Sequence, residues 1–556
     1  MPSPRARSAA AVLAAALVAF PPAAAQDAGH EGCAAPPVGW VPAALLEREV
    51  PLREGTGNAR ETVSTASAPA QSFYDQGLNY LHGYVWIEAA RSFRQALRHD
   101  DRLAMAWIGL SRAYSGLEDA AAARAALEEA RVRASGTAHW ERRRIELRGM
   151  QLDAMARRGD AGMHRAYRKA LDDALAERMD DPELWLLRGN AEEAHPSGRG
   201  QRGGSASTAF YHRALEIDPG SAAAHHYLTH SYENIGAIDK ALEHGEAYAR
   251  AAPSIPHAHH MWGHDLRRVG RIDDAIAAFL KADELERAYY EAEGIPAWMD
   301  WHHGHNLNLL AGSHLHKGQR ARAEALLRKV TALEGSIEPR EFEKKDLPLF
   351  LLASERWQEA LDAARPLISS RFASTRAAGH ALAGHALLGL GRTREAQKEL
   401  KAAGRAAKVR GEGWSSSARP YVDGLRGEIL LHTGKRDEGR AVLIEVERAI
   451  RAVPGPDAWA QALFRLEAIG RTARRLGDWE LAEHTARQMM EHDPAYGGSR
   501  LASALAAARK GDREQASRDL EEARRLWKDA DAGVLKMVEA GSESAGAAAL
   551  SRGSSP

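Results

Sequence analysis

Histidines are concentrated in one stretch of this 556-residue chain. Of its 25 histidines, thirteen lie between residues 225 and 316, far more than an even spread would place there. Neutral imidazole is the commonest side-chain ligand for transition metals in proteins, and a nearby carboxylate adds negative charge. This stretch is therefore the first place to look for chemistry.

The spacing of these residues predicts that they share helix faces. Positions three or four residues apart lie on the same side of an α-helix. Eight candidate metal ligands follow this spacing on three predicted helices: His226, His230, Glu233, His257, His260, His264, His302 and His305. Arg267 and Asn308 continue two of the stripes. The pair His226 and His230 has the i, i+4 spacing of helix-borne zinc ligands, although Tyr227 stands where the zincin motif requires a glutamate.

Not every histidine follows these stripes. His380 and His385 are five residues apart, which does not place them on one helix face. We expect these two to be structural, together with six histidines of the dense stretch that lie off the stripes. Those six are His225, His244, His259, His303, His314 and His316.

The elements that must position the stripes follow from an internal repeat. A pattern of large, apolar, small and aromatic residues recurs with a period of roughly 34 residues. One example begins at Trp262 and Gly263 and continues through Gly270, Ala275 and Phe279. Small residues let two helices touch, and large residues fill the gap between neighbouring pairs. The pattern predicts short helices that pack closely on one another.

This pattern resembles the tetratricopeptide repeat (TPR) family. The resemblance implies an all-α superhelical solenoid of stacked antiparallel helix pairs, with about eight to ten units. In that family, positions flanking the small residue of the first helix face a concave groove. With Gly263 as that residue, the resemblance places on the groove the side chains His257, His260, His264 and Arg267. In the unit around Gly189 it places Asn190 and Glu193 there.

Three stretches also resemble an exported bacterial subfamily of TPR proteins. They are His226-x-x-x-His230-x-x-Glu233, His257-x-x-His260-Met261-x-x-His264 and His305-Asn306. The resemblance covers roughly residues 65–330 and implies no particular activity. That subfamily usually carries another histidine where this chain has Asn308. The resemblance therefore implies that one ligand is lost here or replaced by a weaker one.

Histidines on neighbouring stacked helices are expected to meet. Such helices lie roughly 8–10 Å apart, so their imidazoles can converge in the groove. A site of several histidines with Glu233 would suit Zn, Cu, Fe, Ni or Mn. If the site is catalytic, Glu193 is the candidate acid or base and Arg267 the candidate anion clamp. Asn190 and Asn308 would line the groove beside a substrate or partner.

A second function stays open from the sequence alone. The same groove could bind a peptide or protein partner, as a scaffold without metal or catalysis. Lysine plus arginine and aspartate plus glutamate both number 75, and this balance argues against a general nucleic-acid binder. The single cysteine, Cys33, excludes an intramolecular disulfide and any site built from several cysteines. No recognisable nucleophile motif is present, so the sequence does not decide whether the protein is an enzyme.

The ends of the chain predict its location and boundaries. Residues 1–25 have the features of a signal peptide: Arg5 and Arg7, a short apolar run, and small residues before Gln26. We expect a periplasmic or secreted bacterial protein with no stable membrane insertion after signal removal. Residues 26–70 are expected to form an extended arm, 71–335 a solenoid with the histidine-rich groove, 336–538 degenerate helical repeats, and 539–556 a flexible tail.

Overall fold

The computed structural model describes residues 41–157, 159–193, 200–334, 338–408, 417–453 and 456–539. The predicted signal peptide lies outside these residues, as do the first part of the predicted arm and nearly all of the predicted tail. Within the described ranges, no helix combines the length and the apolar character needed to cross a bilayer.

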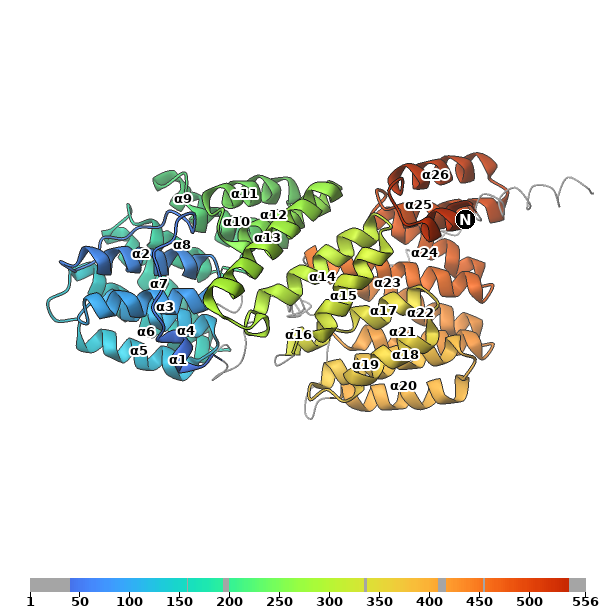
Figure 1. Ribbon diagram of the computed structural model, residues 1–556, viewed down its shortest axis with the longest axis horizontal. Helices are drawn as coiled ribbons and strands as arrows, with labels where there is room; N and C mark the ends of the chain where they lie inside the picture. Colours follow the sequence, from blue (N-terminus) through green and yellow to red (C-terminus); the bar gives the residue numbers. More distant parts are fainter. Residues whose placement is uncertain are drawn as a thin grey trace, which may run out of the picture.

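The described chain is all-α, and its helices pack in sequential antiparallel pairs (Figure 1). This confirms the predicted TPR-like solenoid. The first part contains α1 (Ala43–Leu46), α2 (Ala68–His82), α3 (Trp86–His99), α4 (Ala104–Gly116), α5 (Ala120–Val132), α6 (His139–Ala156), α7 (Ala161–Glu177), α8 (Pro182–Asn190), α9 (Ser205–Ile217), α10 (Ala222–Asn234), α11 (Ile238–Ala251), α12 (Pro256–Arg268), α13 (Ile272–Glu293), the 3₁₀ helix η2 (Ala297–Met299), α14 (Trp301–His316) and α15 (Arg320–Ala332).

The second part of the solenoid begins with two short helices and continues with further antiparallel pairs. It contains α16 (Glu338–Glu343), α17 (Asp346–Ala353), α18 (Trp357–Ile368), α19 (Ala373–Gly389), α20 (Thr393–Ala407), α21 (Arg419–His432), α22 (Arg436–Arg451), α23 (Pro456–Arg475), α24 (Trp479–His492), α25 (Gly497–Lys510) and α26 (Arg513–Leu526). The described helices form twelve pairs, more than the eight to ten counted from the sequence. The pair α6/α7 was not recognised because its small and aromatic residues, Gly149 and Tyr167, do not have the spacing of Gly263 and Phe279.

Small residues of the repeat lie where an aromatic ring crosses a helix. A Cβ atom added to Gly263 of α12 would lie 2.8 Å from the ring of Phe279 on α13. At Gly109 of α4 the corresponding distance to the Phe93 ring is 2.4 Å. Both distances are too short for a real carbon contact. The pattern therefore fixes the close approach of helices within and between pairs.

Glycines also end the three helices that carry the histidine stripes. Gly236, Gly270 and Gly318 follow α10, α12 and α14, with φ angles of 77°, 79° and 71°. This left-handed backbone costs other residues about 1 kcal/mol or more, whereas glycine adopts it freely. Each stripe-bearing helix therefore turns at an equivalent place, and the three helices remain in register.

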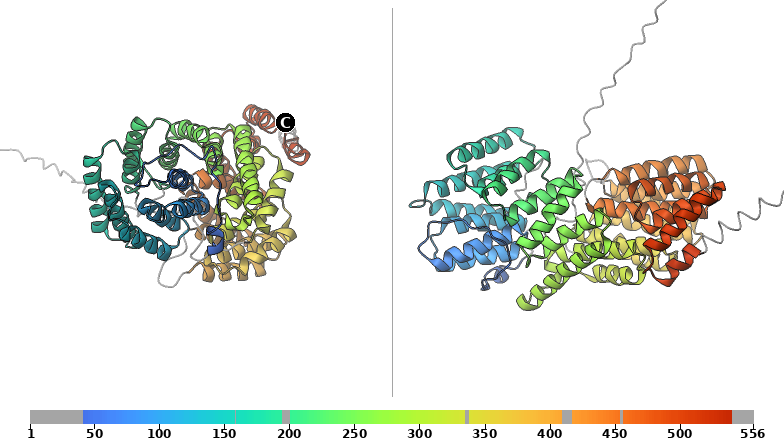
Figure 2. Two further views of the ribbon diagram at one scale, coloured as in Figure 1. Left: turned by 60° about the vertical axis from the view of Figure 1, so that its left-hand side comes forward. Right: turned by 90° about the horizontal axis from the view of Figure 1, so that it is seen from above.

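The first part of the solenoid is curved strongly enough to bring α2 into contact with α10. In the left view of Figure 2, the helix pairs form an arc with the blue helices inside it. Correspondingly, Nδ1 of His82, at the end of α2, lies 2.8 Å from the hydroxyl of Tyr227 on α10. The described part of the arm, residues 41–67, includes the short α1 and crosses this arc. The backbone N–H of Ser254 donates to the carbonyl of Gly55 at 2.9 Å.

Helix α14 lies at the junction of the two parts. Trp301 at its start is buried with the core of the first part, and Ala311 near its end is buried with the core of the second. Figure 1 shows the same division, with α14 between the green and yellow groups of helices. Any group that links α14 to α10 and α12 therefore lies close to this junction.

Candidate metal centre

The eight predicted ligands are buried, and none is more than 4% exposed. They lie on α10, α12 and α14, the first helices of three successive pairs. The structure therefore brings the three stripes together as one array. The seven histidines and Glu233 are called the histidine array below.

The array contains three overlapping histidine triads. The first triad is His226, His230 and His257, the central triad is His257, His260 and His302, and the third triad is His260, His264 and His305. In each, three ring nitrogens lie within 4.8 Å of one another. Metal–imidazole bonds of about 2.1 Å place two ligands on one ion up to about 4 Å apart. Small side-chain movements would therefore close each triad around an ion.

In the central triad, two imidazoles are held through Nδ1. Nδ1 of His260 lies 3.0 Å from Oδ1 of Asn306, whose amide nitrogen donates to the carbonyl of Phe279. Nδ1 of His302 is hydrogen-bonded to Glu286 on α13. Each contact turns Nε2 toward the other histidines. Metal-binding histidines in proteins are commonly oriented in this way.

The nitrogens that face the centre of this triad have no hydrogen-bond partner. They are Nε2 of His260, Nε2 of His302 and one ring nitrogen of His257, whose other ring nitrogen also lacks a partner. A buried polar atom without a partner costs about 1–3 kcal/mol. Three such atoms around one point are therefore unfavourable unless something binds to them. The residues present fit a metal ion with imidazole ligands.

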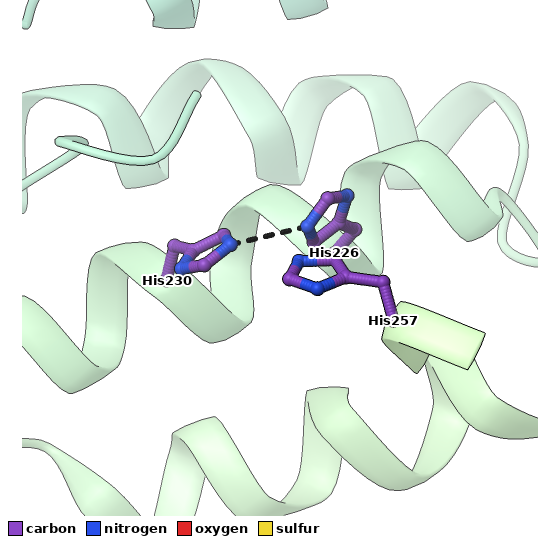
Figure 3. A group of neighbouring side chains, drawn as sticks. All are labelled: His226, His230 and His257. Atoms are coloured by element: carbon purple, nitrogen blue, oxygen red, sulfur yellow. Dashed lines mark hydrogen bonds between the residues drawn. The ribbon is translucent and has the colours of Figure 1, made fainter. Parts of the chain in front are cut away.

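The first triad is drawn in Figure 3, where His226 and His230 come from α10 and His257 comes from α12. Nδ1 of His226 lies 2.7 Å from the carbonyl oxygen of His82, so this nitrogen donates and Nε2 is left as the basic one. The Nε2 atoms of His226 and His230 are 3.1 Å apart. This pair could close on one ion with little movement.

Glutamates lie within the array and beside it. A carboxylate oxygen of Glu233 lies 3.3 Å from Nδ1 of His264, and the other lies 3.7 Å from Nδ1 of His230. Glu343 of α16 lies 3.0 Å from Nδ1 of His305. These carboxylates would offset part of the charge of a bound cation.

Burial keeps the imidazoles of His226, His257 and His260 neutral. It lowers the pKa of His226 to about 3. Burial, and then repulsion from neighbouring histidines, lowers the pKa of His257 and His260 well below 6.5. Burial alone would raise the pKa of Glu286, but contacts with His302 and His303 lower it to about 2. Neutral imidazole is the form that binds metals, so no proton needs to be displaced from His226, His257 or His260 at neutral pH.

The face that was expected to line an open groove is instead covered. The ring of Tyr84, from the turn between α2 and α3, lies 4.4 Å from that of His226 and 5.0 Å from that of His257. At the other end, Phe464 of α23 packs against Arg267. The curvature of the solenoid brings both covering segments inward, which a repeat pattern read one unit at a time does not reveal.

The other predicted site residues divide into two groups. Glu193 and Asn190 are buried near the end of α8, where they accept hydrogen bonds from the backbone N–H of Arg202 and the hydroxyl of Tyr211. Neither belongs to a triad. Arg267 and Asn308 line a cavity of about 100 Å³ beside His305, where the third triad ends.

Sequence analysis did not find several residues that orient the array. Glu286 lies on the second helix of a pair, Glu343 on α16, and the carbonyl of His82 comes from α2. None of them follows the stripe spacing. Of the residues that orient the array, only Asn306 was indicated by the sequence, because it belongs to the His305-Asn306 stretch of the subfamily resemblance. Glu286 also forms a fourth group with Asp283 and His303, a histidine that was expected to be structural.

Comparisons with known proteins find only distant similarities in fold. No protein-family model matches the chain, and no curated protein is significantly similar to it. Among solved structures, the human IFIT1 dimer with PPP-AAAA is 12% identical over 76% of this chain and 90% of that chain, with a TM-score of 0.37. The APC/C hetero-tetramer Cut9–Hcn1 is 10% identical over 85% and 84%, with a TM-score of 0.31.

Naa15/Naa10 bound to HypK-THB gives 12% identity over 85% of this chain and 91% of that chain, with a TM-score of 0.21. These scores and identities are low. The description of this chain as a TPR-like helical repeat protein therefore rests on its own helix pairs and their stacking.

Proposed function

We propose that this chain is a transition-metal-binding protein, whose TPR-like solenoid holds the ion in the histidine array between α10, α12 and α14. One observation supports the proposal above the others. The central triad places three buried ring nitrogens without hydrogen-bond partners around one point, while Asn306 and Glu286 hold two of the rings from behind. Histidines that only fill a core normally have their nitrogens hydrogen-bonded.

The array has room for two ions but not three. The first and third triads share no residue, so both could be filled together. The central triad overlaps both. Because Nδ1 of His260 is engaged by Asn306, its Nε2 can serve only one ion at a time. Filling all three triads would require this atom twice.

The donor set suits Zn, Cu, Fe, Ni or Mn, and such an ion supplies Lewis-acid or redox chemistry when bound. The chain's own part is to orient the imidazoles, keep them neutral and exclude water. We also propose that the protein is located in the periplasm or outside the cell, as residues 1–25 predict. The scaffold alternative is less well supported at the stripes, because the groove face there is buried.

The test is elemental analysis of the mature protein, residue 26 onward, purified without a histidine tag. The double variant His257→Ala/His260→Ala removes a ligand from every triad. We expect about one to two metal equivalents in the wild-type protein and none in the double variant. His259→Ala, on the same helix but off the stripe, is the matched control and should retain its metal.

Circular dichroism should show the same helix content in all three proteins. The proposal would be wrong if the wild-type protein held no metal after incubation with Zn, Cu, Fe, Ni and Mn salts. Equal metal content in the double variant and the control would also contradict it.

A further inference from the structure

A cavity of about 240 Å³ lies beside the central triad. It is enclosed by the turn between α2 and α3, the start of α12, the side of α13 and the start of α14. His257 and His302 form part of its wall, and they are two of the three residues of the central triad. A ligand in this cavity would therefore lie against the proposed metal position.

The cavity reaches the surface at its other end. Ser254, Ala288 and Ala292 line it and are exposed, whereas His257 and His302 are buried. The cavity thus extends from solvent to the histidines. Structural metal sites are closed by protein ligands, whereas catalytic sites keep a position open to a cavity. Three histidines beside such a cavity correspond to the second arrangement.

The charged groups of the cavity wall already have ion-pair or hydrogen-bond partners within the protein. Arg53 forms ion pairs with Glu88 and Glu293, and Glu88 is also 2.5 Å from Arg91. Asp300 accepts hydrogen bonds from the hydroxyl of Tyr290 and the backbone N–H of His302. An ionic ligand would therefore lose its hydration without gaining an unpaired counter-charge.

The rest of the wall combines aliphatic residues such as Val85, Ile255 and Leu285 with four aromatic rings. Tyr80, Tyr84, Tyr289 and Trp301 all line the cavity. The hydroxyl of Tyr289 donates to Glu88 at 3.0 Å, which fixes one of these rings in place. Aromatic walls favour planar ligands through offset and edge-to-face packing.

We propose that this cavity binds a small neutral aromatic molecule of the phenol type, with its ring among Tyr84, Tyr289 and Trp301 and its polar group toward His257 and His302. The metal-facing part of this inference rests on the proposed function. Ligands for such pockets are typically held by apolar contact, with a few polar groups fixing their orientation. The neutral wall and the polar, histidine-lined end are the two features that select this class.

The inference can be tested with phenol and the protein in metal-loaded and metal-free form. Ala288→Trp narrows the exposed end without touching the histidines. Ala277→Trp is the matched control, because it places the same side chain at an exposed position of α13 outside the cavity. By isothermal titration calorimetry, we expect saturable phenol binding that Ala288→Trp weakens about tenfold and Ala277→Trp leaves unchanged. Benzoate, of similar shape but charged, should bind at least about tenfold more weakly than phenol.

The outcomes separate the inference from the metal proposal. Metal retention without phenol binding, or with equal affinity in Ala288→Trp and wild type, would overturn the cavity inference and leave the metal centre standing. Phenol binding that is lost in Ala288→Trp, in a protein that takes up no metal, would support the cavity and refute the metal centre. Tighter binding of benzoate than of phenol would refute the neutral ligand class.

Discussion

At the residue scale, the histidine array depends on the groups behind the imidazoles. Glu286 contacts both His302 and His303 and lies on α13, outside the stripes. It orients His302 and carries the negative charge that a cation beside this histidine would need. Such supporting residues commonly affect metal affinity by 10–100-fold. Glu286 is therefore as informative a target as a ligand.

Replacing Glu286 by glutamine keeps the shape of the side chain and removes its charge. We expect Glu286→Gln to weaken metal binding by about 10–100-fold, because His302 loses its charged acceptor. Competition with a chromophoric chelator measures this affinity. Glu284→Gln, at an exposed position of the same helix, should leave it unchanged. Equal affinities in the two variants would show that Glu286 does not support a metal ligand.

A second residue-scale prediction concerns pH and lies far from the array. Burial raises the pKa of Glu447 to about 7, although contacts with Thr485 and Arg451 lower it in part. The folded state therefore prefers the protonated acid. The corresponding stability is fully present below the ordinary pKa of 4.5 and is lost as the pH rises through 7.

Glu447→Gln should remove this pH dependence. Relative to wild type, its free energy of unfolding should gain up to about 3 kcal/mol between pH 5 and pH 8. Urea denaturation at the two pH values measures the difference. The exposed Glu521 provides the control, because Glu521→Gln should follow the wild-type profile. Parallel profiles for wild type and Glu447→Gln would contradict the raised pKa.

At the element scale, the close contacts within each helix pair keep the stripes in register. Gly263 lies in the middle of α12, between His260 and His264, and the Phe279 ring of α13 packs directly against it. The position of α12 relative to its partner therefore depends on the absence of a side chain at this glycine. A change there would displace the histidines that α12 carries.

Gly263→Ala should destabilise the protein by about 1–3 kcal/mol, because the new methyl group overlaps a ring that is itself fully buried. Gly533→Ala makes the same chemical change at an exposed helical position with open space around it. There, alanine's helix propensity should give a gain of up to about 1 kcal/mol. Urea denaturation shows whether each variant loses or gains free energy of unfolding. Equal changes at the two positions would contradict the packing argument.

At the scale of the whole molecule, the array lies where the two parts of the solenoid meet. It joins α10 and α12 of the first part to α14, whose far end is buried with the second part. Glu343 of α16 extends the connection beyond α14. An ion in the array would therefore stabilise the junction as well as the helices that hold it.

Metal should accordingly raise the unfolding temperature. A ligand that binds only the folded state, at about 100 times its dissociation constant, stabilises it by about 2.7 kcal/mol. We expect a chelator to lower the melting temperature of the metal-loaded protein by several degrees. The variant His257→Ala/His260→Ala should melt at one temperature with or without chelator. An unchanged wild-type melting temperature after metal removal would show that the ion does not couple to folding.

The sequence by itself determined the helix pairs and the stripes. Both depend on local periodicity: Gly263 and Phe279 recur at repeat spacing, and His257, His260 and His264 share one face because a helix turns every 3.6 residues. From that alone it was possible to expect the imidazoles of three neighbouring helices to converge. The same local rule also placed Glu193 and Asn190 on the groove, although they belong to none of the triads.

Only the tertiary structure decided which ring nitrogens are open and what surrounds them. The carbonyl of His82, Glu286 and Glu343 reach the array from α2, α13 and α16, and Tyr84 covers it from the turn after α2. Glu286 and Glu343 come from helices close to α14 in the chain, whereas the contacts made by His82 and Tyr84 join segments far apart in the chain. They depend on the curvature that accumulates over many stacked pairs, each of which contributes a small rotation. No single repeat encodes that sum, so the buried array and its neighbouring cavity could not be derived from spacing.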